Sequence, residues 1–428
     1  MKVWLLQSGE PVPRDAGDRP LRSGMLAAAL AERGNEVLWW TSAFEHQRKR
    51  FVAQPHEEWT WRRGVRVHAL PAPGYRRNVS IARYRDHRAV ATAFTQRARQ
   101  EPLPDLVIAS MPCHHLAYAA AMYASERGIP LVADVRDLWP DIFAARLPAG
   151  PLRALGRLVL TGDQARLRFL LRRADAIVAV SHGYLRWALA KAGRSQRALD
   201  GVFYIGQYPP RRDDVPALAP AIASWIATSG AQRIFTFVGT LGGSYRVDVV
   251  LRAAERLAAA GRRDIGFVIA GEGEQREAVR AAAARLPNVC YTGWLERPAV
   301  AALLAASSVG LVPCESADDT LPNKVFEYLA FGLPLISSLE GEMTELITNR
   351  GLGANYRFDD VYALERAVLR LADDETARAA AAQAAEHCFH ELGDAGRIYE
   401  AFAELAERAQ SARAPHEQEP ERNAGSNS

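Results

Sequence analysis

The sequence predicts an α/β protein with two doubly wound domains in tandem, and three observations support this fold class. Short runs rich in β-branched and aromatic residues alternate with longer helical patterns as far as about residue 390, which is typical of parallel sheets. The Pro-rich, charged stretch 206–221 interrupts this rhythm, and the count of strands restarts after it. A length of 428 residues exceeds one ordinary core, while 49% hydrophobic and 24% charged residues are the proportions of a globular chain.

The first half contains six strand-like runs separated by helix-like stretches. The stretch 21–34 illustrates the helical pattern, because Met25, Leu26 and Leu30 share one face and Gly34 supplies a stop. The predicted strands cover residues 3–6, 36–40, 65–70, 105–110, 130–135 and 176–181.

The second half repeats the pattern with five further strands. They are predicted at residues 234–239, 266–271, 288–293, 309–313 and 334–338. We expect an N-terminal domain over 1–205, a linker over 206–217, a second domain over 218–395, a bracing amphipathic helix over 396–412 and a disordered tail over 413–428. Ligands of doubly wound sheets bind beyond the carboxyl ends of the strands, so a central cleft between the domains is the expected place for a substrate.

The charge is distributed unevenly. Residues 1–200 hold 31 Lys or Arg against 18 Asp or Glu, whereas residues 201–428 hold 22 against 31. A basic first half suits a nucleic acid, an anionic lipid surface or a phosphorylated substrate, and a solvated Arg-rich surface is the simpler explanation. No run reaches the roughly 18 apolar residues of a membrane span, no signal peptide is evident and the four cysteines are widely spaced, so we expect a cytosolic protein with reduced thiols.

The most informative segment is residues 315–338, ESADDTLPNKVFEYLAFGLPLISS. Pro322 stands where a helix would begin, Lys324 lies in the first turn, and Glu327 follows three residues later on the same face. The free N–H groups of a helix start, the helix dipole and a lysine form an anion site that suits a diphosphate. Glu327 could accept hydrogen bonds from a ribose diol, although an ordinary helix with a first-turn salt bridge would show the same residues.

This segment resembles the donor-binding motif of the family 4 retaining glycosyltransferases of the GT-B fold, which has two Rossmann-like domains. In that motif two acidic residues bracket seven others just before a helix and a Gly-x-Pro turn. Glu327 matches the second acidic residue, and Asp319 stands where the family usually has the first glutamate. The resemblance implies that Lys324 holds the donor diphosphate, Glu327 the ribose, and Asp319 the sugar. It places Leu321, Pro322 and Asn323 beside the donor as well.

Further donor-side residues follow from the same resemblance. Residues 237–257 resemble the first strand, loop and helix of the donor domain, where the family has Gly-Arg and a later Lys for the phosphates. Here Thr240 replaces that arginine, and Arg246 could supply the charge one place beyond the expected lysine. Trp294 would lie against the nucleobase or pack in the core. The corresponding turn glycines are Gly239, Gly271 and Gly293.

In the N-terminal half, Arg136 occupies the position at which the family often has a histidine, and Asp137 follows it. An arginine there could neutralise a leaving diphosphate without titrating. Gly17 is the candidate for close backbone approach to the phosphates or the acceptor. The basic amphipathic segments 75–88 and 152–173 could rest on anionic lipid, and they are also compatible with plain exposed helix faces.

The resemblance therefore implies a retaining hexosyltransferase, with a nucleotide-diphosphate sugar, UDP-linked in our expectation, as donor. The acceptor would be a glycan or a polyprenyl-diphosphate-linked sugar of bacterial O-antigen, capsule or exopolysaccharide synthesis, at the inner face of the membrane. No Asp-x-Asp triplet occurs, so no metal or other cofactor is expected; His114 and His115 are interpreted as structural, and no nucleic-acid module is recognised. The alternatives are a sugar-nucleotide epimerase of the same fold and a non-catalytic protein that binds a nucleotide sugar or a partner transferase.

Overall fold

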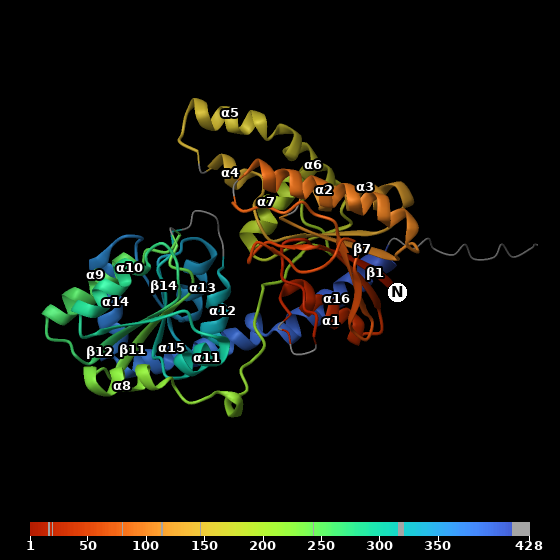
Figure 1. Cartoon of the computed structure of the whole chain (residues 1–428). Coiled ribbons are helices and arrows are strands. Elements are labelled where there is room, and N and C mark those ends of the chain that lie inside the picture. Colours follow the sequence, from red (N-terminus) through yellow and green to blue (C-terminus); the bar gives the residue numbers. More distant parts are fainter. Residues whose placement is uncertain are drawn as a thin grey trace, which may run out of the picture. The chain divides into compact units, whose positions relative to one another are not determined.

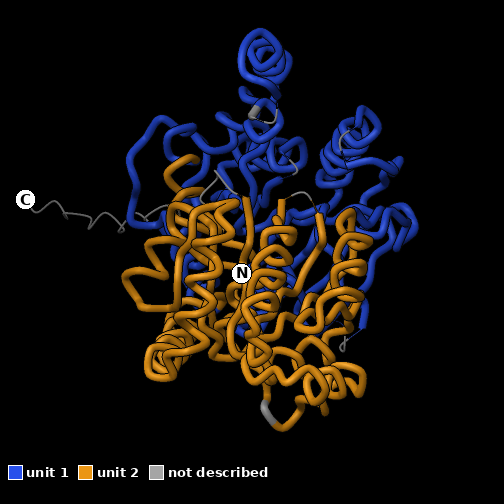
Figure 2. The backbone as a smooth tube through the Cα atoms, turned by 90° about the vertical axis from the view of Figure 1, so that its left-hand side faces the viewer, with its two compact units in different colours: residues 1–178, 188–201, 400–428 blue, residues 179–187, 202–399 orange. Residues whose placement is uncertain are grey.

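A computed structural model describes residues 1–15, 18, 20–78, 80–112, 114–145, 147–242, 244–315 and 321–412. The chain divides into two compact units (Figure 2). Unit 1 comprises residues 1–178, 188–201 and the chain from Glu400 onward, and unit 2 comprises residues 179–187 and 202–399. The main change from one unit to the other thus falls just before the expected linker 206–217, and the expected tail 413–428 lies outside the described residues.

Unit 1 is built on an eight-stranded sheet with the order β10-β9-β8-β7-β1-β2-β6-β5. Its strands are β1 (Lys2–Leu6), β2 (Glu36–Ser42), β5 (Glu58–Arg62), β6 (Val65–Leu70), β7 (Leu106–Ser110), β8 (Leu131–Val135), β9 (Ala176–Ala179) and β10 (Gly201–Val202). The pairs β6–β2, β2–β1, β1–β7 and β7–β8 are parallel, whereas β5 runs antiparallel to β6 at the edge. A separate two-stranded ribbon joins β3 (Phe44–Glu45) to β4 (Arg50–Phe51).

Helices follow most of these strands in the chain, as is usual for parallel connections, whereas β2 and β6 are joined through β3, β4 and β5. The helices are α1 (Arg22–Glu32), α2 (Ile81–Arg97), α3 (His114–Arg127), α4 (Asp141–Ala145), α5 (Pro151–Val159), α6 (Thr161–Arg173) and α7 (His182–Ala192), with a 3₁₀ turn at Ala98–Gln100. Helix α3 packs against α2 and α6 (Figure 1). Strand β7 is buried along its whole length, as expected for a central parallel strand covered on both faces.

Unit 2 is built on a six-stranded sheet with the order β13-β12-β11-β14-β15-β16. Its strands are β11 (Arg233–Val238), β12 (Ile265–Ala270), β13 (Val289–Gly293), β14 (Val309–Val312), β15 (Leu335–Ser337) and β16 (Gly353–Asn355). All five strand pairs are parallel. Side chains alternate between the faces of β11, so Phe235 and Phe237 enter one core with α9 and α14, while Ile234 enters another with Ile222 of α8.

The helices of unit 2 follow the same alternation (Figure 1). They are α8 (Pro220–Ser229), α9 (Val247–Ala259), α10 (Arg276–Arg285), α11 (Arg297–Ala305), α12 (Asn323–Ala330), α13 (Glu342–Arg350), α14 (Val361–Asp373) and α15 (Glu375–Cys388), with short turns at Arg212–Asp214 and Phe389–Gly393. Helix α16 (Ala395–Ser411) belongs to unit 2 as far as Tyr399 and to unit 1 from Glu400.

The two sheets share one topology. The neighbouring strands are β6-β2-β1-β7-β8-β9 in one sheet and β13-β12-β11-β14-β15-β16 in the other. When each set is numbered by its order in the chain, both show the doubly wound order 3-2-1-4-5-6. The order reverses between β1 and β7 in unit 1 and between β11 and β14 in unit 2. These switch points are where such sheets bind ligands, and they locate the two clusters described below.

The predicted fold class is confirmed, and every run predicted as a strand contains one. The sequence analysis did not predict β3, β4, β5, β10 and β16. Four of them have only two or three residues, and β5, β10 and β16 lie at sheet edges, where burial on both faces is not needed and the apolar run is weak.

Candidate functional site

The carboxyl ends of β11, β12 and β13 meet through glycines. Gly239 donates its backbone N–H to Ala270 O at 2.9 Å, and Gly271 donates to Gly293 O at 2.8 Å. An added Cβ at Gly271 would lie 1.8 Å from Gly239 O, and both residues have positive φ. Only glycine fits such an approach, so the glycines let the turns after β11 and β12 pack directly against each other.

The loop after β11 is held from two sides. Gln275 donates from Nε2 to Gly242 O at 2.9 Å and to Tyr245 O at 2.6 Å. On the other side, Arg246 N donates to Pro313 O at 2.7 Å, just after β14. The loop therefore spans from β11 to β14 and leads into α9.

Lys324 lies under this loop. Its side chain is buried, and Nζ lies 3.8 Å from the centre of the Phe237 ring and 3.6 Å from that of Tyr245. An added Cβ at Gly239 would be 2.6 Å from Nζ, so the glycine admits the ammonium group beneath it. Nζ has no hydrogen-bond partner among the described residues.

The position of Lys324 follows from its short helix. Pro322, with φ −62° and ψ 144°, is the N-cap of α12, and the helix begins at Asn323 as its sequence predicts. Tyr328 anchors the helix to the sheet because its hydroxyl accepts the N–H of Val238 at 2.9 Å. Helix α12, fixed in this way, places Lys324 at the end of β11.

Burial lowers the pKa of Lys324 to about 7, against smaller opposing effects of Cys314 and Glu327. Removing an ammonium group from water without giving it an anion disfavours the charged form. An anion placed beside Nζ would restore the charge. Lys324 is therefore a buried amine that has no carboxylate partner among the residues that the structure describes.

Arg246, which we expected to bind the donor phosphates, pairs with carboxylates in the structure. Its guanidinium makes a bidentate pair with Asp248, at 2.7 and 2.8 Å, and a third contact to Asp359 at 3.1 Å. Asp248 also lies in the first turn of α9, where a carboxylate is favourable. The positive charge of Arg246, which we expected to bind a donor phosphate, is already paired with the carboxylates of Asp248 and Asp359.

Glu327 is half-buried and makes no hydrogen bond to another described residue. Together with Gln207, Tyr208 and Arg297 it lines a pocket of 320 Å³. Its carboxylate is thus available to a ligand, as the motif requires. The pairing partner in the motif, Asp319, lies outside the described residues.

The other predicted donor residues are placed as follows. Trp294 is 69% exposed, and its Nε1 donates to Glu296 at 3.2 Å, so the alternative that it packs in the core is wrong. Thr240 is exposed in the glycine loop, and Gly293 follows Thr292 with φ +68°. Leu321 is buried, Pro322 is half-buried and Asn323 is exposed at the start of α12.

The switch point of unit 1 is occupied by a buried ion cluster. Asp134 in β8 is fully buried and accepts from Arg22 Nη2 at 2.8 Å and from Arg136 Nε at 2.6 Å. Burial opposes ionisation of Asp134, but Arg136 and Arg22 together hold its pKa down to about 2. Ser110, at the end of β7, donates to the same carboxylate at 3.1 Å.

Arg136 has further partners in this cluster. Its Nη1 donates to Glu10 at 2.7 Å, and its Nη2 donates to Ser23 at 3.0 Å and to Ser110 at 2.9 Å. The structure gives Arg136 a task that the sequence analysis did not include, which is to neutralise two carboxylates. Asp137 is half-buried next to it, and Gly17 lies outside the described residues.

One histidine cluster has ligands suited to a metal. Side-chain atoms of His114, His115 and Asp163 all lie within 4.8 Å of one another, and all three residues are buried. Asp163 is already paired with Arg166 at 2.8 Å and accepts from Tyr84 at 3.2 Å. A cation would have to compete with that arginine, so the cluster is better suited to the structural role that we expected.

Each of the two units matches the profile of a known protein family. The family described as "Glycosyl transferases group 1" matches residues 232–374, which lie in unit 2. The "Glycosyl transferase 4-like domain" matches residues 21–199, most of which lie in unit 1. The two matches together cover about three quarters of the chain.

Two relatives have assigned activities. The 2-deoxystreptamine glucosyltransferase of Streptomyces kanamyceticus is 27% identical over 212 residues, which are 48% of this chain and 54% of that protein. The GDP-mannose-dependent alpha-(1-6)-phosphatidylinositol dimannoside mannosyltransferase of Mycobacterium tuberculosis is 36% identical over 118 residues, 27% of this chain and 30% of that protein. The chain thus spans about half or less of the length of these relatives.

Solved structures are similar over almost the whole chain. HepE of Anabaena, in complex with UDP, is 14% identical with a TM-score of 0.64, over 95% of this chain and 99% of that one. Sucrose-phosphate synthase of Thermosynechococcus elongatus is 15% identical with a TM-score of 0.69, over 96% and 99%. WaaG, a glycosyltransferase involved in lipopolysaccharide biosynthesis, is 15% identical with a TM-score of 0.61, over 95% and 99%. At these identities the likeness concerns the fold.

Proposed function

The chain belongs to the group 1 glycosyl transferases of the GT-B fold, and from this premise we propose that it transfers a hexosyl group from a UDP-sugar to an acceptor hydroxyl with retention of the anomeric configuration. The acceptor in this proposal is a bacterial surface glycan under assembly, carried on a polyprenyl diphosphate. No metal ion takes part in the proposed reaction, in which protonated Lys324 supplies the positive charge.

The observation that carries the proposal is the unpartnered ammonium group of Lys324. It is buried beneath the glycine turn that follows β11, and no carboxylate among the described residues pairs with it. A diphosphate laid on Gly239 would meet Nζ at the place where a side chain is excluded. Glu327, three residues further along α12, is free to accept from the ribose hydroxyls.

The chemistry follows from where charge develops. As the bond between the anomeric carbon and the diphosphate breaks, negative charge grows on the leaving oxygen, and protonated Lys324 stabilises it. The acceptor oxygen bonds to the anomeric carbon on the same face, and its proton passes to the departing phosphate oxygen. No protein nucleophile is needed in this sequence, and the products are UDP and the lengthened glycan.

The choice of base and acceptor rests on relatives. HepE was solved with UDP and with UDP-glucose, whereas the mycobacterial relative is named for GDP-mannose, so UDP and GDP are the bases to be compared. WaaG is named for lipopolysaccharide biosynthesis, which supports a surface glycan as the acceptor.

The proposal is tested by thermal unfolding of the purified protein with UDP, GDP, ADP and dTDP and their sugars. A ligand at 100 times its dissociation constant adds about 2.7 kcal/mol to the free energy of unfolding when it binds only the folded state. We expect stabilisation by the uridine series, and loss of the effect in Lys324→Ala and Glu327→Ala. Glu345→Ala, which removes an exposed carboxylate from α13, is the matched control.

Two measurements then distinguish a catalytic transferase from a non-catalytic protein that binds a nucleotide sugar. Release of UDP in the presence of extracted lipid-linked glycans, with a chelator in the assay, should continue in the wild type and fall in Asp319→Asn. Nucleotide binding without any transfer would favour the non-catalytic alternative. No stabilisation by any nucleotide sugar would refute the donor site itself.

A further inference from the structure

Helix α5 exposes an apolar face to solvent. None of its residues is buried, and its aliphatic side chains are exposed by 59% at Leu152, 56% at Leu155, 70% at Leu158 and 74% at Val159. Their spacing of three, four and seven residues places them on one side of the helix. In Figure 1, α5 lies beyond α6, on the side remote from β1 and β7. A contiguous exposed apolar face of this kind marks an interaction site.

The other side of α5 is basic and faces its own unit. Arg153 and Arg157 are four residues apart, and Arg153 donates to Leu147 O at 3.0 and 2.8 Å. Gly156 lies on this side, because an added Cβ there would be 2.5 Å from Leu147 Cδ1. The helix is therefore amphipathic with its polar side inward, opposite to an ordinary surface helix.

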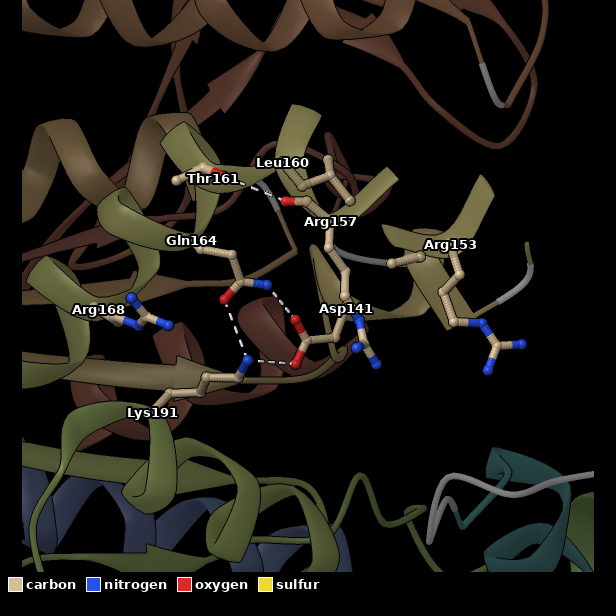
Figure 3. Close-up of a pocket in the computed structure, with 9 residues that line it drawn as sticks. Asp141, Arg153, Arg157, Leu160, Thr161, Gln164, Arg168 and Lys191 are labelled. Atoms are coloured by element: carbon tan, nitrogen blue, oxygen red, sulfur yellow. Dashed lines mark hydrogen bonds and ion pairs between the residues drawn. The ribbon is translucent and has the colours of Figure 1, made fainter. Parts of the chain in front are cut away.

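A pocket of 460 Å³ lies on this basic side, between α4, α5, α6 and α7. Figure 3 shows Asp141, Gln164 and Lys191 turned toward one another, with Arg157 and Arg168 on either side of them in the view. Lys191 pairs with Asp141 at 2.6 Å, so one cation is matched. Arg157 and Arg168 form no ion pair with any carboxylate that the structure describes.

The pocket has an excess of positive charge, which suits an anionic ligand. Four cations line it against one carboxylate, and two of the cations, Arg157 and Arg168, have no ion-pair partner in the described part of the chain. Guanidinium groups bind phosphate oxygens by paired, charge-assisted hydrogen bonds. A phosphate group held here would lie directly behind the apolar face of α5.

We propose that α5 lies in the surface of an anionic bilayer, with its aliphatic side chains among the acyl chains and a lipid phosphate group in the pocket beside Arg157 and Arg168. Interfacial helices bind in this manner, by apolar burial combined with attraction of basic residues to anionic headgroups. This deepens the lipid side of the proposed function, because it names the surface that would bring the enzyme to a lipid-linked acceptor. A second copy of the chain is a weaker occupant, since it would oppose the same cations to one another.

The apolar half of the proposal is tested by sedimentation with vesicles of phosphatidylcholine alone and of equal parts phosphatidylcholine and phosphatidylglycerol. We expect the wild type to sediment with the mixed vesicles, and the triple variant Leu152→Ser, Leu155→Ser, Leu158→Ser to remain in solution. Leu103→Ser is the control, because Leu103 is 58% exposed on the same unit but outside α5.

The phosphate half is tested with Arg157→Gln combined with Arg168→Gln. We expect about thirtyfold weaker binding to the mixed vesicles, since each of the two basic residues near an anionic surface contributes to attraction. Arg63→Gln combined with Arg99→Gln removes the same charge from exposed positions elsewhere in unit 1 and should bind as the wild type does.

Three results would overturn the proposal. The first is equal sedimentation of the leucine triple variant and the wild type. The second is a dimer in vesicle-free solution that the leucine variant abolishes, which would assign α5 to a second copy. The third is binding of inorganic phosphate that depends on Arg157 without any binding to vesicles. Stabilisation by nucleotides does not involve α5, so failure here would leave the donor-site proposal standing.

Discussion

Lys324 stores unfavourable free energy in the ligand-free protein. Its amine is buried beside two aromatic rings with no hydrogen-bond partner among the described residues, and its pKa is lowered to about 7 by burial. Since the group has a pKa near 10.5 in the unfolded chain, the unfolded state binds a proton more strongly. The residue that we propose to bind the diphosphate is thus maintained at the expense of stability, as is common at functional sites.

The first prediction concerns this cost. Between pH 7 and pH 10 the unfolded chain carries more protons at Lys324 than the folded one, so the contribution of this residue to stability rises with pH in that window. We expect Lys324→Met to be more stable than the wild type at pH 7, by roughly 1.4 kcal/mol per unit of pKa shift relieved, and the advantage to shrink toward pH 10. Urea unfolding at both pH values measures it, with the exposed Lys2→Met as control. Equal stabilities of Lys324→Met and wild type at pH 7 would contradict the buried, unpaired amine.

Asp134 gives the opposite case. Arg136 and Arg22 hold its pKa near 2 despite burial, below the ordinary value of 3.8, so its contribution to stability is complete above about pH 4 and is lost as the pH falls toward 2. We expect Asp134→Asn to lose about 3–5 kcal/mol at pH 7, because two buried guanidinium groups lose their shared anion.

Denaturant unfolding of Asp134→Asn and of the surface variant Asp213→Asn checks this second prediction. The same measurement on Arg136→Met distinguishes a structural from a purely catalytic arginine. A variant that loses turnover while keeping wild-type stability would show that the pairing with Asp134 and Glu10 contributes little.

At the scale of elements, the site of unit 2 depends on how closely two loops approach. The turn after β11 and the turn after β12 touch through Gly239 and Gly271, and α12 is tied to the same strand end by Tyr328. Each of these elements is short, yet together they fix the ammonium group relative to bare backbone. The position of Lys324 therefore depends on both the loop after β11 and helix α12.

The third prediction compares two glycines with positive φ. At Gly271 an added Cβ would meet Gly239 O at 1.8 Å, whereas at Gly261 nothing lies within 4 Å. Gly261→Ala should cost only the strain of its conformation, about 1 kcal/mol, while Gly271→Ala must also displace the loop and should cost at least about 1–3 kcal/mol more. Thermal unfolding with and without UDP measures both, and only Gly271→Ala should weaken the response to the nucleotide.

Elements of this kind explain what could be predicted from the sequence. The central strands are continuous apolar runs, and Pro322 marks the start of α12, so the fold class and the position of Lys324 were accessible. The arginines also have distant partners, Asp359 at 113 residues from Arg246 and Glu10 at 126 residues from Arg136, and these were not accessible. The near partners, Asp248 and Asp134, stand two residues away in the sequence and were overlooked. Local spacing carries no information on the distant pairs, which form only when distant strand ends meet at a switch point.

At the scale of the whole molecule, the two units are interleaved along the chain. Helix α16 leaves unit 2 at Tyr399, whose hydroxyl donates to Ile205 O at 2.7 Å, and its remainder belongs to unit 1. There Phe402 is fully buried, and Arg33 pairs with Glu407 at 2.7 Å. From Glu400 onward, α16 is thus part of the core of unit 1.

The fourth prediction is a truncation. A chain ending at Tyr399 lacks Phe402 and the partners of Arg33, and the loss of one buried phenylalanine alone typically costs about 3–5 kcal/mol. We expect faster hydrogen exchange throughout residues 1–178, with unit 2 little changed. A chain ending at Ala412 is the control because it keeps all of α16. Equal protection of residues 1–178 in both truncated chains would contradict the assignment of Glu400 onward to unit 1.

The placement of α16 also sets an order of events during synthesis. Domains of most proteins fold in sequence as they leave the ribosome, the N-terminal one first. Here the first unit lacks part of its core until the final helix has been translated, whereas unit 2 has all its segments once Tyr399 is made. Unit 1 therefore cannot complete its core before residues 400–411 have been synthesised, and until then the nascent chain carries an incomplete, Arg-rich domain.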